Sequence, residues 1–510
     1  MANRHSYRHQ NRVAAEQCGT TMYGLECGWH RRWSPTARAL CHLPTTTVGN
    51  HRCNVISTPK AQCTVDSYGV RKPYMDVIDV SRGDPHGGGV KPLTFVRQVL
   101  AACIYPELVE SDKLPVDVKQ RAQSLLSACD GGSVGSYTLS GGISYIQCSV
   151  SNFISRRDGG VPSSPENIFM TSGSQRSLML VLKLLDHNQA SLPTGVLTAV
   201  PAYSSFKMML QWLGAAIVPY YLDEEQGWAM EVEELRRALQ ASKGVCNTVA
   251  LYVINPGNPT GHVQSRKCIE KVIRFAAEER LFLMADEVYQ ESVFGEGSEF
   301  VSYKKVLSEM GPHLSHTVEL ASFHSASKGF MGECGLRGGY VELVNLDPAV
   351  MKYAYTLFST DICAPVTGQL ALELMANPPR PGDPSYPVYA QETQSIRAML
   401  VHNMNWVPEF LNNIQGISCQ PMMGGAFVFP RLYLPQAAIE KAKVVGMQPD
   451  LWYCKRLLEE AGVCVRPGCE YGQKESTHHI RLCVMTPVET MEEVLKRLKN
   501  FHLHFLNEFS

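Results

Sequence analysis

The 510-residue sequence lacks the features that would place it in several broad classes of protein. Its clearest apolar runs, such as TVALYVI at residues 248–254, are far shorter than the roughly 20 residues that a membrane-crossing helix needs. Its 17 cysteines include no CxxC pair and no regular spacing, which argues against a disulfide scaffold or a zinc ribbon and for a reducing, intracellular setting. We find no internal repeat and no secretory signal. The sequence therefore predicts a soluble globular protein with no membrane partner and no metal site.

A strong net charge is also missing, since the chain carries a formal charge of −1, and this balance gives no electrostatic case for binding nucleic acid. The charge is uneven along the chain. The first 60 residues hold eight Lys and Arg against two Glu, whereas the remainder holds 39 basic and 46 acidic residues. An Arg-rich, acid-poor start is typical of a mitochondrial presequence, although no amphipathic face accompanies it here. The cytoplasm and the mitochondrial matrix both stay open as compartments.

The clearest organised stretch predicts a strand, a helix and a second strand between residues 248 and 285. TVALYVI at 248–254 is a β-branched apolar run typical of a strand buried on both faces. The breaker residues NPGNPTG follow, and Ser265 is then suited to cap a helix whose apolar residues recur at helical spacing. LFLMA at 281–285 is the next buried strand. This order predicts a right-handed βαβ unit in a parallel sheet, and so an α/β fold.

Three polar side chains follow the ends of predicted parallel strands. Asn258 comes after strand 248–254, Asp286 ends the next strand, and Lys328 follows a third strand, VELASF at 318–323. Open parallel sheets bind ligands beyond the carboxyl ends of their strands. We therefore expect these three side chains to converge at one edge of the sheet.

The whole chain is expected to divide into four segments. Residues 1–70 are expected to form a poorly ordered extension, and 71–95 a segment that joins a small domain. Residues 96–365 are expected to form a large mostly parallel sheet domain with flanking helices. Residues 366–510 are expected to form a smaller α+β domain, which ends in an amphipathic helix with the sequence ETMEEVLKRLKNFHLHF.

The residue types at the predicted sheet edge suit pyridoxal phosphate. Lys328, among small neighbours, could form a Schiff base with an aldehyde, and a buried Asp286 could pair with a pyridinium N–H. Tyr289 and Asn258 could donate hydrogen bonds to a phenolate oxygen, and Arg337 could grip a phosphate. TSGSQRSLMLVLKLL at 171–185 reads as a strand end, a glycine and a helix start, which together form an anion cradle.

The strings INPGNPTG, ADEVYQ and SFHSASKGFMGECGLRGG resemble those of the fold-type I, class I pyridoxal-phosphate-dependent aminotransferases, and in detail those of the alanine aminotransferases. The likeness extends from about residue 70 to the C-terminus. It implies a large sheet domain that binds pyridoxal 5′-phosphate, a smaller α+β domain and a homodimer with shared active sites. Two segments depart from the family pattern: the loop TSGSQRS, and PAYSSF, which lacks the usual proline after its tyrosine.

The resemblance also implies roles for individual residues. Lys328 and Asp286 are the catalytic candidates. Gly83, Asn258 and Arg481 match residues that hold the substrate, Arg481 through its α-carboxylate, and Tyr137 matches a tyrosine that reaches the phosphate of the neighbouring subunit. The remaining cofactor candidates are Ser174, Gln175, Tyr203, Tyr289, Ser325 and Arg337, and Arg176 is a further candidate for the phosphate.

The function predicted is amino transfer from L-alanine to 2-oxoglutarate, giving pyruvate and L-glutamate by a ping-pong mechanism. A kynurenine or aromatic aminotransferase is the alternative within the fold. A non-catalytic regulator with a DNA-binding head is disfavoured, because the N-terminal 60 residues show no helix-turn-helix pattern. A hydrolase is disfavoured because GGSVG, around Ser133, lacks the preceding strand and following helix that a nucleophile elbow requires.

Overall fold

The computed structural model describes residues 74–510 except 187–190 and 296. The predicted extension over residues 1–70 and the presequence hypothesis therefore lie outside the described residues. Among the residues that are described, no helix is both long and apolar enough to cross a membrane.

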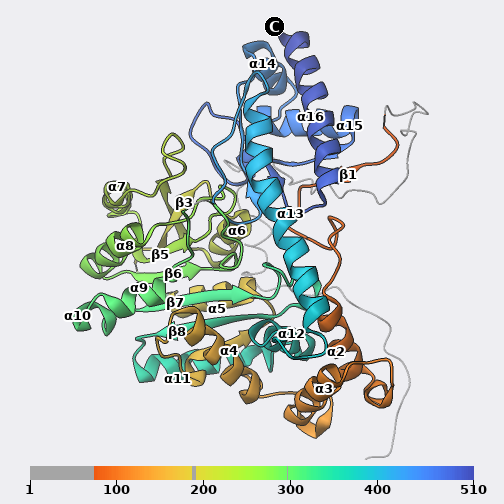
Figure 1. Ribbon diagram of the computed structural model, residues 1–510. Coiled ribbons are helices and arrows are strands. Elements are labelled where there is room, and N and C mark those ends of the chain that lie inside the picture. The colour runs from red at the N-terminus through yellow and green to blue at the C-terminus, as the bar shows by residue number, and fades with distance from the viewer. Residues whose placement is uncertain (1–73, 187–190, 296) are drawn as a thin grey trace, which may run out of the picture. The chain divides into compact units, whose positions relative to one another are not determined.

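A seven-stranded sheet organises the large part of the fold, with strand order β2-β8-β7-β6-β5-β3-β4 (Figure 1). Strands β3 to β7 run parallel to one another, and β8 is antiparallel to both of its neighbours. The bounds of the strands are β2 Ile168–Thr171, β3 Thr194–Val200, β4 Ala216–Tyr221, β5 Asn247–Ile254, β6 Phe282–Asp286, β7 Leu320–Ser325 and β8 Gly339–Val344. The prediction of a mostly parallel α/β sheet is confirmed.

Helices cover both faces of this sheet because alternate residues of each strand point to opposite faces. In β5, Ala250 and Tyr252 pack in the same apolar core as helices α5, α6 and α11, whereas Leu251 and Val253 pack with α7, α8 and α9. A third core joins β2 to α2, α3, α4 and α12. The bounds of the helices are α2 Thr94–Ile104, α3 Val116–Ala128, α4 Ser144–Arg157, α5 Ser174–Leu185, α6 Ser204–Leu213, α7 Val232–Ser242, α8 Arg266–Glu279, α9 Tyr303–Glu309, α11 Pro348–Phe358 and α12 Val366–Ala376.

The predicted βαβ unit has the expected order and nearly the expected bounds. Strand β5 begins one residue before the predicted run, and the side chain of Ser265 accepts a hydrogen bond from the backbone N–H of Cys268 at the start of α8. Strand β7 lies two residues later than predicted, at Leu320–Ser325, and still ends before Lys328.

Long helix α13, Tyr386–Asn412, runs from the region of α2 and α12 toward the C-terminal helices (Figure 1). Its C-terminal half packs with α15, Pro449–Ala461, and α16, Val488–Phe509, in a separate apolar core. The short strands of this region are β9 Ile417–Ser418, β10 Phe427–Val428, β11 Arg431–Leu432, β12 Val463–Cys464, β13 Arg466–Pro467 and β14 Ile480–Cys483, and the remaining helix is α14 Gln436–Val444. Strand β1, Ile78–Asp79, pairs in parallel with β12, so the early segment contacts the C-terminal region. The domain boundaries themselves stay a prediction.

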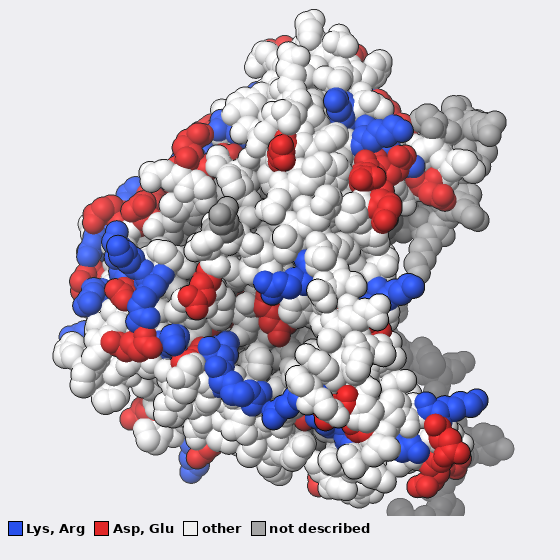
Figure 2. Space-filling view, viewed as in Figure 1, with Lys and Arg blue, Asp and Glu red and all other residues white. Residues whose placement is uncertain are grey.

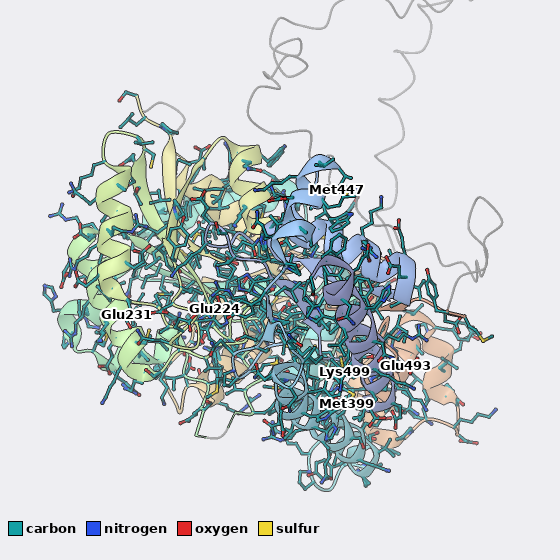
Figure 3. All side chains as sticks on the ribbon, turned by 90° about the horizontal axis from the view of Figure 1, so that it is seen from above. Glu224, Glu231, Met399, Met447, Glu493 and Lys499 are labelled. Atoms are coloured by element: carbon teal, nitrogen blue, oxygen red, sulfur yellow. The ribbon has the colours of Figure 1, made fainter. Side chains whose placement is uncertain are left out.

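Glu224 joins the sheet body to the C-terminal region. It lies in the turn between β4 and α7, on the side nearer the C-terminal helices (Figure 3). Its carboxylate lies 3.1 Å from Nε2 of His479 and 3.7 Å from the guanidinium of Arg431. The turn that follows the carboxyl end of β4 is thereby held against residues from the C-terminal region.

Candidate functional site

One cavity of about 290 Å³ lies at the carboxyl ends of β5, β6 and β7. It gathers the predicted site residues except Tyr137 and Arg176, and draws them from distant segments of the chain. The predicted residues that line it are Gly83, Ser174, Gln175, Tyr203, Asn258, Asp286, Tyr289, Ser325, Lys328, Arg337 and Arg481. The expected convergence of Asn258, Asp286 and Lys328 is therefore present.

Asp286 is the buried carboxylate of the cavity, with 4% of its surface exposed at the end of β6. Burial raises its pKa to about 6, against the opposing effects of a hydrogen bond from Tyr252, the backbone N–H of Val288 and the charge of Lys328. The Tyr252 hydroxyl donates to Oδ2 at 2.9 Å. A cationic N–H facing this carboxylate would stabilise its ionised form, as a protonated pyridine nitrogen does.

Lys328 follows β7 and is half-buried. Its Nζ donates to the backbone carbonyl of Gly83 and lies 6.0 Å from the centre of the Tyr289 ring. A Cβ placed on Gly83 would approach Nζ to 2.9 Å and the Phe427 ring to 2.7 Å. Only glycine at position 83 leaves the amine the space that it has.

Arg481 is a buried guanidinium, 7% exposed, between two aromatic rings. Its Cζ lies 3.7 Å from the centre of Phe427 and 4.7 Å from that of Tyr471. Its two terminal nitrogens donate to Oδ1 of Asn258 and to the carbonyl of Ser81, both neutral acceptors, and its Nε has no partner among the described residues. A buried cation held only by neutral oxygens favours an anionic ligand such as a carboxylate.

The phosphate cradle is built where β2 meets α5. Gly173 caps this helix with a φ of 97°, and a Cβ there would come within 2.3 Å of Nη2 of Arg337. The Arg337 guanidinium donates to the carbonyls of Cys334 and Ser172, so it is fixed beside the first turn of α5. The positive end of a helix, backbone N–H groups and a guanidinium together suit a phosphate.

Two phosphate candidates do not lie in this cradle. The guanidinium of Arg176 makes a two-pronged ion pair with Asp361, at 2.6 and 2.7 Å, and does not line the cavity. The Arg176 guanidinium is thus paired with an acid 185 positions away in sequence, and its role toward the phosphate stays a prediction. Tyr137 is 72% exposed and does not line the cavity, and its role toward a phosphate stays a prediction.

Sequence analysis missed several residues that line the cavity or contact its lining residues. Tyr252 lies within the sequence of a buried strand. The only sign of its contact with Asp286 was that a buried tyrosine hydroxyl needs a hydrogen-bond partner. Phe427 and Tyr471, which sandwich Arg481, come from loops and short strands without a motif. Arg82, Asp84 and Cys334 also line the cavity and had no assigned role.

The GGSVG motif that resembled a nucleophile elbow does not form one. Ser133 is exposed in the segment between α3 and α4, after a helix rather than a strand.

Charged side chains of both signs are intermingled on the face shown in Figure 2, so no single-sign field marks this face.

Residues 99–498 match the family model described as aminotransferase class I and II. The chain is 50% identical to alanine aminotransferase 2 of Xenopus tropicalis over 87% of this chain and 84% of the relative. It is 49% identical to alanine aminotransferase 1 of Homo sapiens, over 87% and 89% of the two chains. A solved aminotransferase from Escherichia coli shares the fold with a TM-score of 0.66 at 19% identity, over 84% and 92%. The prediction of the fold and of the family is confirmed.

Proposed function

This chain belongs to the class I and II aminotransferases, whose cofactor is pyridoxal phosphate, and from that premise we propose that it transfers the amino group of L-alanine to 2-oxoglutarate. The observation that carries the proposal is that a half-buried amine and a buried guanidinium are held side by side. Lys328 donates to the carbonyl of Gly83, and Arg481 donates to the carbonyl of Ser81, two residues earlier. The 50% identity to an alanine aminotransferase over 87% of the chain supports the choice of substrates.

The residues of the cavity fit the cofactor. Asp286 would pair with the ring nitrogen, and Asn258 and Tyr289 would approach the ring hydroxyl. Tyr203, which follows β3 at the cavity wall, would stack on the ring. The phosphate would lie in the cradle, whose proposed ligands are Ser174, Gln175, Ser325 and Arg337. When bound, pyridoxal phosphate supplies a sink for the electrons left on the substrate Cα after its proton departs.

Binding and proton movement are then the work of the chain's own side chains. Arg481 and Asn258 hold the α-carboxylate of the substrate, and the aromatic rings beside Arg481 exclude water from this contact. Lys328 Nζ acts as general base and removes the proton from the substrate Cα, and it returns a proton to Cα in the reverse direction. Its Nζ lies beside the Gly83 carbonyl and 6.0 Å from the centre of the Tyr289 ring.

Pairing of two copies belongs to the same proposal. Residues 137–141, α11 and the turn after α11 lie close together beside Ser172 of the cradle. They expose large apolar side chains, which mark an interaction surface. These are Tyr137, Leu139, Tyr353, Tyr355 and Ile362, at 47–72% exposure. A second copy covering this surface would bring Tyr137 to the partner's phosphate.

Steady-state kinetics of an Arg481→Gln variant test the proposal. The Michaelis constants for L-alanine and for 2-oxoglutarate should both rise, because both substrates place the same carboxylate on Arg481. Arg466→Gln is the matched control, since Arg466 is the cross-strand neighbour of Arg481 and its guanidinium pairs with Glu470. A rise for one substrate alone, or an equal effect of Arg466→Gln, would refute the assignment. Wild-type protein that makes no pyruvate from L-alanine would refute the proposed reaction.

A further inference from the structure

His479 lies two positions before Arg481, in the segment that leads into β14. Its side chain is 2% exposed, and its ring stacks on Phe429 with centroids 4.7 Å apart and planes 2° from parallel. Alternate residues of an extended segment point to the same side. The imidazole of His479 and the guanidinium of Arg481 therefore belong to one face of this segment.

A row of rings connects these two side chains. The Phe429 ring meets the Tyr471 ring edge-on, with centroids 5.9 Å apart, and the Tyr471 ring lies 4.7 Å from Cζ of Arg481. Phe427 covers the opposite face of the guanidinium. Aromatic and cation–π contacts have preferred distances and orientations. A ring that is fixed at the His479 end of the row therefore limits how far the guanidinium can move.

Hydrogen bonds at both nitrogens fix the ring of His479. Nε2 lies 3.1 Å from a carboxylate oxygen of Glu224, and Nδ1 lies 2.9 Å from Oε1 of Gln473. Glu224 belongs to the turn between β4 and α7 in the sheet body, nearer the C-terminal helices (Figure 3). Gln473 belongs to the loop that carries Tyr471. The ring is thus tied both to the sheet body and to the loop beside Arg481.

The partners of His479 show where its protons lie. An ionised carboxylate only accepts hydrogen bonds, so Nε2 donates to Glu224. The amide nitrogen of Gln473 donates to Oδ2 of Asp450 at 3.1 Å, and this oxygen also accepts from the backbone N–H of Cys469 at 2.6 Å. The amide oxygen of Gln473 is therefore the atom that faces Nδ1, and it is also an acceptor. A ring that donates from both nitrogens is a cation.

We infer that His479 is a doubly protonated positioning residue, which holds Arg481 in the orientation that grips the substrate carboxylate. This inference rests on the proposed function, which it deepens. Neither His479 nor Glu224 lines the cavity, so the effect reaches the substrate through the row of rings. The two side chains are 2% and 13% exposed, and removing one partner of such a buried pair leaves the other charge unbalanced.

The first test removes the charge that balances the ring. Glu224→Gln should raise KM for L-alanine and for 2-oxoglutarate about tenfold, as loss of one buried charged partner does. The value of kcat should stay within about twofold, because Lys328 is not touched. Glu225→Gln is the matched control. Glu225 lies 3.6 Å from the guanidinium of Arg431, which Glu224 also approaches, but its side chain is 80% exposed, so both KM values should stay within about twofold.

The second test observes the protons and needs neither cofactor nor turnover. Nuclear magnetic resonance of apo-protein with isotope-labelled histidine, at neutral pH, should show a proton on each ring nitrogen of His479. The signals are assigned by their loss in His479→Phe. That variant keeps a ring against Phe429 and removes both hydrogen bonds, so it should raise KM for both substrates at least as much as Glu224→Gln does.

Three results would overturn the inference. One is a ring nitrogen of His479 that carries no proton at neutral pH. Another is a pair of KM values that stays within about twofold in Glu224→Gln and His479→Phe, with folding checked by the melting temperature. The third is an equal rise in Glu225→Gln, which would show a general effect of charge. Wild-type protein that makes no pyruvate from L-alanine would instead count against the proposed function and would leave the proton measurement valid.

Discussion

Replacing Tyr252 by phenylalanine removes a single hydrogen bond to Asp286, a carboxylate that lines the cavity. The Tyr252 hydroxyl donates to Asp286 at 2.9 Å, and both groups are buried. The ring stacks on Phe206 with centroids 3.6 Å apart, and phenylalanine keeps that contact. The substitution therefore changes the electrostatics at Asp286 and leaves the packing intact.

The size of the effect follows from the charge of the acceptor. A buried hydrogen bond to a charged group contributes about 1.5–3 kcal/mol, which is roughly a tenfold to hundredfold change in affinity. Tyr252→Phe should weaken binding of pyridoxal phosphate to the apo-protein by that factor, measured by spectroscopic titration. Tyr220→Phe is the matched control. Its hydroxyl donates to the neutral carbonyl of Tyr252 at 3.1 Å, so its loss should lower stability and not cofactor affinity.

The pH dependence of cofactor affinity tests the role of Tyr252 a second time. Because the pKa of Asp286 is raised to about 6, the carboxyl is protonated below that value and cannot attract a cationic ring nitrogen. Affinity for the cofactor should therefore rise as the pH rises toward about 6 and level off above it. Loss of the Tyr252 hydrogen bond raises this pKa further, so the levelling should move to higher pH. A change in affinity below about threefold with no movement of the profile would refute the role of Tyr252.

Three further predictions concern other parts of the site and its support. Lys328→Ala should lower kcat by roughly 10³-fold or more while the melting temperature stays within a few degrees, because it removes the general base; retained turnover would contradict this. Gly173→Ala should abolish tight cofactor binding, because its Cβ would meet Arg337 at 2.3 Å. Gly214→Ala is the control, because Gly214 also has a positive φ but nothing lies within 4 Å of the added Cβ, and it should cost only about 1 kcal/mol of stability. Equal loss of cofactor from the two variants would contradict the clash with Arg337. Burial raises the pKa of Glu287 to about 7, so the folded apo-protein binds that proton more tightly and loses stability as pH rises from about 4.5 to 7. Glu287→Gln should remove about 2 kcal/mol of loss between pH 5 and pH 7.5, measured by urea unfolding at these two pH values, and an unchanged pH slope would contradict it.

The fold and much of the site could be predicted because their signals are local. The apolar run before Asn258, the cap at Ser265 and the acid at the end of the next strand each report their own structure, and parallel topology then brings their ends together. What sequence reasoning missed depends on contacts between distant segments. The pairing of Arg176 with Asp361 is one such contact.

The residues around Arg481 could not be predicted from the sequence either. Phe427 and Tyr471 carry no motif, and only the folded C-terminal region brings their rings to either side of the guanidinium. The carbonyls of Ser81 and Gly83 likewise carry no signal in the sequence, although they hold Arg481 and Lys328.

The central claim is that Lys328 and Arg481 act together in transfer of the alanine amino group, and a single-turnover experiment tests it most directly. Purified enzyme loaded with pyridoxal phosphate is mixed with L-alanine and no oxo acid, and pyruvate and the visible absorbance are followed together. We predict close to one pyruvate per chain with loss of the visible band, and return of the band when 2-oxoglutarate is added. The account would be contradicted by a band that L-alanine leaves unchanged, or by equal pyruvate formation from the Lys328→Ala variant.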